Sequence, residues 1–261
     1  MFEYIILDVK DRVATISFNR PDVGNAFAKE SYSEIKDALE LCAKDREVGA
    51  IILTGTGKHF SAGGDIRRFK GLIESGEYIP AESILRAGAM AKAVRDCPKP
   101  VIAKINGAAA GAGCSLALAC DFRFVTPKSK MIMSFIKLGL SGDTGAMYYL
   151  QRLVGTAKTL EIMMLGDAIG GEDAVSCGLA TRCVAEETFD RETTAFAQRL
   201  ANGPLAAYAK QKELMMKYFY GELSDYYDDE AAFMASCSRT ADFSEAVDAF
   251  LEKRSPVFRG E

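Results

Sequence analysis

Two short loops rich in glycine and alanine contain backbone amides that could do chemistry. The first is His59-Phe60-Ser61-Ala62-Gly63-Gly64-Asp65-Ile66, and the second is Asn106-Gly107-Ala108-Ala109-Ala110-Gly111-Ala112-Gly113-Cys114-Ser115. Each loop follows an apolar run typical of a buried strand and leads into a segment with a helical pattern. The start of a helix offers unpaired N–H groups and a partial positive charge. Two such starts that converge from neighbouring strands would offer two N–H donors to one oxygen, which is an oxyanion hole.

Side chains that could act as acids, bases or metal ligands are few. Asp65 is placed to cap the helix that follows the first loop. Asp143 lies in Gly142-Asp143-Thr144-Gly145 at the start of another predicted helix, where it is either a cap or a functional carboxylate. A histidine metal site or a Ser-His-Asp triad would have to rest on His59, the single histidine. The seven cysteines form no C-x-x-C pair, which favours reduced thiols over a disulfide framework.

Alternating strands and helices must position these loops. The hydrophobic pattern predicts a hairpin over 3–9 and 12–18, further strands over 49–54, 101–105 and 122–125, and helices over 30–44, 82–96 and 114–120. From about residue 143 the pattern predicts helices over 143–152, 156–164, 171–178, 190–201, 204–220, 224–237 and 243–253. Strands that are apolar on both faces and alternate with helices indicate an α/β core with a mainly parallel sheet.

Composition narrows the class of protein further. The 261 residues carry a net charge of −4 and are 49% hydrophobic, so nothing in the whole-chain balance attracts nucleic acid or an anionic membrane. No apolar run approaches the roughly 20 residues of a membrane-spanning helix. The opening Met1-Phe2-Glu3-Tyr4-Ile5 lacks the basic and apolar segments of a secretory signal, so we expect a cytoplasmic protein.

A series of short motifs carries a family resemblance over essentially the whole chain. They include Asn19-Arg20-Pro21, Asn25-Ala26-Phe27, Phe60 to Ile66, Lys99 to Ala103, Asn106 to Gly113, Cys120-Asp121-Phe122-Arg123, Leu138-Gly139-Leu140, Arg152-Leu153-Val154-Gly155, Gly178-Leu179-Ala180 and Phe250 to Arg254. In content and order the chain resembles the enoyl-CoA hydratase/isomerase (crotonase) superfamily.

The resemblance implies an α/β fold of the ClpP/crotonase-like kind. It divides the chain into a ββα-repeat spiral core over 1–200, which binds acyl-CoA, and a helical C-terminal trimerisation segment over 201–261. It implies an acyl-CoA thioester as substrate and a homotrimer or a dimer of trimers, with no nucleic acid or membrane partner. Coenzyme A enters as part of the substrate, and no metal or redox cofactor is implied.

The resemblance also assigns the site. The oxyanion donors would be the backbone N–H groups of Gly64 and Ala112. From composition rather than from the resemblance, Phe135, with Met131, Met133, Met147, Tyr148 and Tyr149, would form an apolar acyl pocket. Residues lining CoA would be Ala26, Phe27, Ser61, Gly63, Asp65 and Ile66, with Phe258 and Arg259 reaching CoA in a neighbouring subunit. A solvated terminal arginine is the alternative interpretation of Arg259.

The choice of reaction depends on acidic residues. Hydratases of this family carry two glutamates, and the matching positions here are Ser115 and Phe135. Isomerases of the family carry an acidic residue at the place of Asp143, which predicts a Δ3–Δ2 enoyl-CoA isomerase with one carboxylate as base and then acid. The dehalogenase branch also has an aspartate there, but its histidine is missing from residues 86–91.

Three alternatives stay open at this point. The first is an enoyl-CoA hydratase (lyase) of fatty-acid or aromatic-acid breakdown, and the second is a non-catalytic acyl-CoA-binding protein. The third is RNA binding, which would need a lysine-rich helix. The cluster Lys210-Gln211-Lys212 with Lys217 is short and mixed with Glu213, so a solvated helix face is favoured. Asp121 in its Cys-Asp-Phe-Arg context is interpreted as structural.

Overall fold

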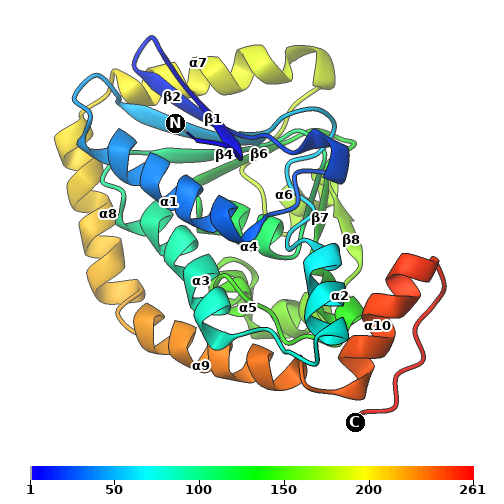
Figure 1. The fold of residues 1–261 in the computed structure, drawn as a ribbon. Helices are drawn as coiled ribbons and strands as arrows, with labels where there is room; N and C mark the ends of the chain where they lie inside the picture. The colour runs from blue at the N-terminus through cyan, green and yellow to red at the C-terminus, as the bar shows by residue number, and fades with distance from the viewer. Residues whose placement is uncertain (1) are drawn as a thin grey trace.

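The main sheet of the protein has six strands in the order β1-β2-β3-β4-β6-β9. The structure, a computed structural model, describes residues 2–261. Its strands are β1 (Ile5–Lys10), β2 (Val13–Phe18), β3 (Ala50–Gly55), β4 (Val101–Ile105), β6 (Phe122–Val125) and β9 (Arg182–Cys183). β1 pairs antiparallel with β2, and every later pair is parallel, as the apolar runs predict (Figure 1).

A second, three-stranded sheet runs in the order β5-β7-β8 and was not predicted. Its strands are β5 (Ala108–Ala110), β7 (Lys130–Ile132) and β8 (Ala168–Gly170). The expectation of an irregular loop over 107–113 is therefore corrected at its centre. Three alanines carry no strand signal of their own, and they become a strand because Lys130–Ile132 lies beside them in parallel register.

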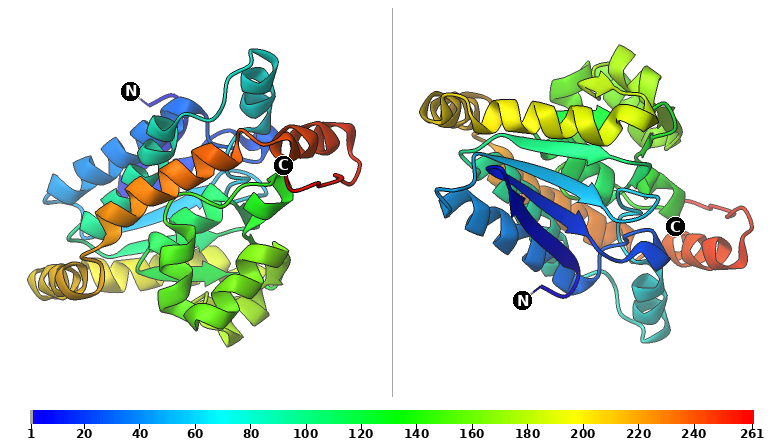
Figure 2. Two further views of the ribbon diagram at one scale, coloured as in Figure 1. Left: turned by 90° about the horizontal axis from the view of Figure 1, so that it is seen from below. Right: turned by 90° about the horizontal axis from the view of Figure 1, so that it is seen from above.

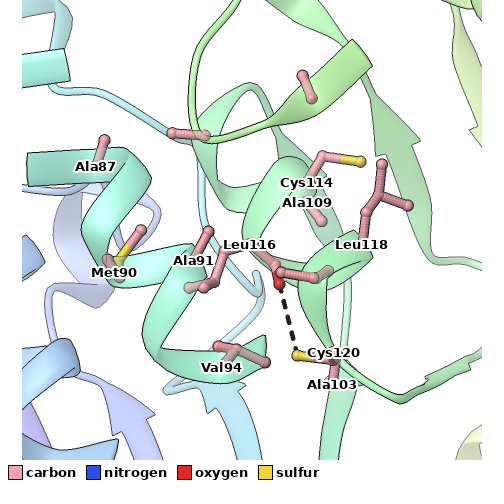
Figure 3. Packing of buried hydrophobic residues seen from close by; sticks show 14 of the residues in the cluster. Ala87, Met90, Ala91, Val94, Ala103, Ala109, Cys114, Leu116, Leu118 and Cys120 are labelled. Carbon is pink, nitrogen blue, oxygen red and sulfur yellow. Dashed lines mark hydrogen bonds between the residues drawn. The ribbon is translucent and has the colours of Figure 1, made fainter. Parts of the chain in front are cut away.

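Helices cover both faces of the main sheet (Figure 2). α7 (Phe189–Ala201) packs on one face, where Ile52, Ile102 and Phe124 are buried against it. α1 (Lys29–Lys44), α3 (Ala81–Asp96) and α4 (Ala112–Ala119) lie on the other face. Figure 3 shows α3 and α4 packed through small and aliphatic side chains, with Cys120 Sγ donating to Leu116 O at 3.5 Å. This packing fixes α4, and with it the second glycine-rich loop.

The middle of the chain contains α2 (Ile66–Glu74), α5 (Ala146–Leu165) and α6 (Gly171–Ser176), with short 3-10 helices at Pro21–Val23, Ser134–Leu138 and Glu186–Thr188. α5 spans the two helices predicted over 143–152 and 156–164, which its structure keeps as two helical halves. A kink at Gly155, with φ of 75°, stands between its two halves, which is where the pattern breaks.

The C-terminal helices are α8 (Leu205–Phe219), α9 (Leu223–Cys237) and α10 (Ala241–Glu252). α9 runs along α3, where the Tyr227 ring fills the space that a side chain at Gly88 would need. α10 packs on α2 through Phe69 and Phe243, whose ring centroids are 5.8 Å apart. Within residues 2–261, no helix is long and apolar enough to cross a membrane.

Candidate active site

The two glycine-rich loops lie side by side, as the order of the strands requires. Ser61 and Ala109 form a parallel bridge, and the Ala110 amide donates to Ser61 O at 2.8 Å. β3 and β4, which precede the loops, are neighbours in the sheet. The starts of α2 and α4 are therefore brought to the same edge, as predicted.

Gly63 sets how closely the loops approach. Its φ is +85°, and a methyl group there would lie 2.6 Å from Ala110 O and 3.2 Å from Ala112 N. Only glycine meets both conditions without strain. Gly63 thus allows the backbone before Gly64 to lie against the first residue of α4.

The two predicted oxyanion donors have free amides. Within residues 2–261, neither Gly64 N nor Ala112 N donates a hydrogen bond to another group. Ala112 is the first residue of α4, where the helix supplies no acceptor for its amide. Gly64 precedes Asp65, whose Oδ1 caps α2 by accepting from Arg67 N at 3.2 Å. Two free amides on neighbouring loops can together bind one negatively charged oxygen.

A cavity of about 530 Å³ opens beside Gly64. It contains three of the predicted CoA-lining residues, Ala26, Asp65 and Ile66, and its wall carries three cationic side chains that suit an anionic ligand. The lining residues are Asp22, Val23, Ala26, Ala62, Gly64, Asp65, Ile66, Arg67, Ala110, Ser134, Lys137, Leu138, Phe250, Leu251 and Lys253.

Phe27 and Ser61 lie behind this cavity and do not line it. The Phe27 ring is buried edge-on against Phe18, and the Phe27 amide donates to Gly63 O at 2.7 Å. Ser61 is buried, and its hydroxyl donates to Asn25 O at 2.8 Å and accepts from Gly63 N at 3.1 Å. Both residues therefore stabilise the loop from its buried side. Phe27 does so through its ring and its amide, and Ser61 does so through its hydrogen-bonded hydroxyl.

Asp143 is a buried carboxyl with 7% of its surface exposed. Burial raises its pKa to about 6, while the hydrogen bond from Thr144 Oγ1 at 2.8 Å and the charge of Arg68 oppose the rise. It does not act as the cap of α5, because the residue at that position is Gly145. A carboxyl whose pKa lies near 6 can both accept and release a proton near neutral pH.

Phe135 links the Asp143 loop to the second glycine-rich loop. Methyl groups at Gly111 and Gly142 would lie 3.7 Å and 3.6 Å from its ring. The ring therefore lies between the start of α4 and the residue before Asp143. Ser115, which the family resemblance matches to the other hydratase glutamate, is fully buried and donates to Gly111 O at 3.2 Å.

Other parts of the predicted acyl pocket are filled by the protein itself. Met131 and Met133 are buried in the core, and Tyr149 donates to or accepts from Tyr227 Oη at 2.8 Å. Tyr148 is covered by the rings of Tyr220 and Tyr226. Met147 is 36% exposed. Of that set, only the Phe135 ring is placed against the candidate site by the contacts described above, because rings at the C-terminal helices cover Tyr148 and Tyr149.

Arg259 lies in the C-terminal tail rather than beside the cavity. Its amide donates to Asp242 Oδ1 at 2.7 Å, and Phe258 is 45% exposed. Contact between this tail and CoA in a neighbouring subunit remains a prediction.

Asp121 has the structural role expected of it, since it accepts from Val101 N at 2.9 Å and from Lys212 Nζ at 2.6 Å.

Three residues near Asp143 carry no signal in the sequence. Arg68 of α2 places a positive charge near Asp143 and donates to Ser83 Oγ. Tyr32 of α1 is buried, and burial together with the charge of Asp143 raises its pKa, so it is a neutral phenol. Glu230 of α9 is a second buried carboxyl. Each of the three lies on an element far from Asp143 in the sequence, and the residues on either side of it form no recognisable motif.

The fold and site together define an α/β protein with a helical C-terminus, two free amides on neighbouring loops, and a buried carboxyl on a loop that Phe135 links to one of them. A family model described as enoyl-CoA hydratase/isomerase matches residues 8–261. The chain therefore belongs to the enoyl-CoA hydratase/isomerase (crotonase) superfamily, whose members act on acyl-CoA substrates.

Relatives along the full length differ in their reactions. The chain is 31% identical to the trans-2-decenoyl-[acyl-carrier-protein] isomerase of Streptococcus mutans, covering 100% of this chain and 99% of that one. It is 34% identical to a probable enoyl-CoA hydratase of Rhodobacter capsulatus, covering 99% of both. It is 32% identical to the 1,2-epoxyphenylacetyl-CoA isomerase of Escherichia coli, covering 100% of both.

A solved structure has the same fold. The enoyl-CoA hydratase of Mycobacterium avium subsp. paratuberculosis superposes with a TM-score of 0.89 at 29% identity, covering 98% of this chain and 99% of that one. The predicted crotonase fold is thereby confirmed. Because the relatives include both isomerases and hydratases, the reaction must be argued from the site.

Proposed function

We propose that the protein is an enoyl-CoA isomerase that moves a carbon–carbon double bond between the Δ3 and Δ2 positions. The thioester oxygen accepts hydrogen bonds from Gly64 N and Ala112 N. Asp143 removes a proton from C2, and the electron pair of that C–H bond moves into the thioester to give a dienolate. Asp143 then returns the proton at C4, which leaves the double bond between C2 and C3.

One observation carries this proposal: Asp143 is buried, and burial raises its pKa to about 6. A single group that serves as base and then as acid works best when its pKa lies near the working pH. The free amides stabilise the charge that develops on the oxygen, and one such donor is worth about 3–4 kcal/mol in comparable sites.

Hydration is the second candidate, because hydratases are among the relatives. Adding water across a double bond needs a group to position the water and a group to deliver the proton. Ser115 and Phe135 stand where hydratases carry their glutamates, and neither can do acid–base work there. We therefore expect slow hydration or none.

An absorbance assay separates the two reactions. The protein is mixed with 3-hexenoyl-CoA and, separately, with crotonyl-CoA, and the absorbance of the conjugated enoyl thioester is followed. We expect a rise with the first substrate and no loss with the second. Rapid loss with crotonyl-CoA would contradict the proposal in favour of a hydratase, and binding of both without turnover would favour a non-catalytic acyl-CoA-binding protein.

We also propose that the protein assembles as a homotrimer or a dimer of trimers. Apolar side chains stay uncovered on the outer surface of α8, where Leu214, Tyr218 and Phe219 are 57%, 66% and 60% exposed. Exposed apolar surface of this kind is typical of a subunit interface. Sedimentation equilibrium would test this, and a monomer at micromolar concentration would contradict it.

A further inference from the structure

Glu230 of α9 is a buried carboxyl that takes no part in the proton transfer proposed above. It is 7% exposed, and its Oε2 accepts a hydrogen bond from Gly145 N at 2.9 Å. The two residues are 85 positions apart in the sequence. This bond therefore joins the C-terminal helices to the loop that contains Asp143.

The loop that receives this bond has an unusual backbone. Gly142, Thr144 and Gly145 have φ of 120°, 61° and 77°. A β-branched residue such as Thr144 rarely adopts a positive φ, and such a conformation persists only where its surroundings hold it. The loop is thus strained at Thr144, directly after Asp143, and depends on contacts from elsewhere.

The surroundings of Gly145 supply such contacts. A methyl group there would lie 2.6 Å from the Tyr149 ring and 3.2 Å from the Tyr227 ring. The hydroxyl groups of these two tyrosines are hydrogen-bonded at 2.8 Å. Glu230 adds the polar contact, because its carboxyl satisfies the buried amide at the start of α5.

The protonation states of Glu230 and Asp143 suit a contact in which Glu230 holds the Gly145 amide. Burial raises the pKa of Glu230 to about 8, and the charge of Asp143 acts in the same direction, whereas the bond from Gly145 N opposes the rise. At pH 7 Glu230 is therefore a neutral acid beside an ionised Asp143. A neutral carboxyl can accept from the amide without placing a second negative charge beside the base.

Other titratable and charged groups act on Glu230 or Asp143 from four elements. They are Tyr226 and Tyr227 of α9, Tyr149 of α5, Arg68 of α2 and Tyr32 of α1. Arg95 and Asp96 of α3 act on Tyr149 and Tyr227 in turn. The pKa values of Tyr149, Tyr226, Tyr227 and Tyr32 are all raised, chiefly by burial, so these phenols stay neutral at pH 7.

We propose that Glu230 is a positioning residue for Asp143. Its carboxyl, supplied by the C-terminal helix α9, holds the Gly145 amide and thereby the left-handed loop that presents Asp143 to the substrate. The inference rests on the proposed role of Asp143 as the base. Glu230 acts on the loop and not on the acyl-CoA, so its loss affects turnover and leaves substrate binding intact.

The first test compares Glu230→Ala with Glu230→Gln. A displacement of the base by about 1 Å costs roughly 100-fold in rate, so we expect kcat of Glu230→Ala to fall by about that factor. KM stays within about twofold, because uniform substrate binding is unchanged. Glu230→Gln retains most of kcat, since a neutral amide accepts from Gly145 N as the neutral acid does. Asp228→Asn, an exposed site on the same helix, is the matched control and keeps wild-type kinetics.

The second test does not require activity. Carbon-13 NMR of carboxyl-labelled protein follows the Asp143 resonance, which is identified by its loss in Asp143→Asn. In the wild type we expect one inflection near pH 6 and a second near pH 8, as Glu230 ionises close by. Glu230→Gln keeps the first inflection and loses the second.

Failure of the Glu230 proposal can be distinguished from failure of the proposed isomerase function. If the wild type does not isomerise any enoyl-CoA, that function fails, and the NMR titration still decides whether Glu230 and Asp143 are coupled. If Glu230→Ala does not fold, the titration of Glu230→Gln decides instead. Wild-type kcat in Glu230→Ala, or a single inflection in the wild-type titration, would overturn the proposal.

Discussion

The acid–base properties of Asp143 depend on where the fold places its carboxyl. An aspartate in a Gly-Asp-Thr-Gly run is locally indistinguishable from a helix cap, and the structure gives the position before α5 to Gly145 instead. The side chain that is freed from capping is buried, with a hydroxyl from Thr144 and the charge of Arg68 nearby. Burial, the neighbouring hydroxyl in its own loop and the distant Arg68 of α2 together determine the pKa of Asp143.

Replacing Asp143 with asparagine tests this residue directly. We expect Asp143→Asn to lower kcat on 3-hexenoyl-CoA by about 100- to 10,000-fold, which is the usual contribution of a positioned acid–base group. Binding of acyl-CoA, measured by calorimetry, remains near that of the wild type. A variant that keeps full activity would show that the carboxyl has no role in proton transfer.

The same carboxyl predicts a pH dependence of stability. Its folded-state pKa is raised from 3.8 to about 6, so the folded protein binds this proton more tightly than the unfolded chain does. Its contribution to the free energy of unfolding therefore falls as pH rises from about 4 to 6 and stays low above pH 6. At pH 7, Asp143→Asn should be more stable than the wild type by about 1–3 kcal/mol in urea unfolding.

Below pH 4 the difference should disappear, because the carboxyl is then protonated in both states. A variant that is less stable than the wild type at pH 7 would contradict burial as the main cause of the raised pKa.

At the scale of elements, the starts of α2 and α4 carry the two free amides of the proposed oxyanion site. The sequence allowed this prediction because each loop follows an apolar strand, and parallel strands present their carboxyl ends at one edge. β5, β7 and β8 escaped prediction since they have three residues each and are stabilised by pairing rather than by their composition. The role of Phe27 and Ser61 behind the loop also needed the structure, as motif position does not reveal which way a side chain points.

Proline at Ala112 tests the amide of α4 alone. Proline is tolerated at the first position of a helix and removes the N–H that is proposed to bind the thioester oxygen. We expect Ala112→Pro to lose about 100- to 1,000-fold in kcat, with the helix content seen by circular dichroism unchanged. Ala81→Pro makes the same change at the first residue of α3 and should leave activity intact. Equal losses in both variants would indicate a folding defect.

At the scale of the whole molecule, the C-terminal helices contact the loop that contains Asp143. α9 supplies Glu230, and α8 is tied to the core by Lys212. Lys212 donates to Val94 O at 3.3 Å, Lys99 O at 3.1 Å and Asp121 Oδ2 at 2.6 Å. Lys212, one residue of the basic cluster, is nine-tenths buried and therefore attaches α8 to the core.

Lys212→Met tests that attachment. It leaves the Asp121 carboxylate with its weaker pairing to Arg95 at 3.3 Å, so we expect the free energy of unfolding to fall by about 3–5 kcal/mol. Denaturant unfolding measures the loss, and Lys210→Met, at an exposed pair with Glu213, is the control with almost no effect. Equal stability of both variants would show that α8 is held mainly by apolar packing.

The central claim is that Asp143 alone carries a proton from C2 to C4 of the substrate. Following a labelled hydrogen atom tests this claim most directly. 3-Hexenoyl-CoA that carries deuterium at C2 is converted in ordinary water, and mass spectrometry and NMR locate the label in the product. Because Asp143 is buried, its deuteron exchanges slowly with solvent, and a measurable fraction of the product should carry deuterium at C4. Conversion at full rate with all the transferred label lost to solvent would contradict a single carboxylate that acts as both base and acid.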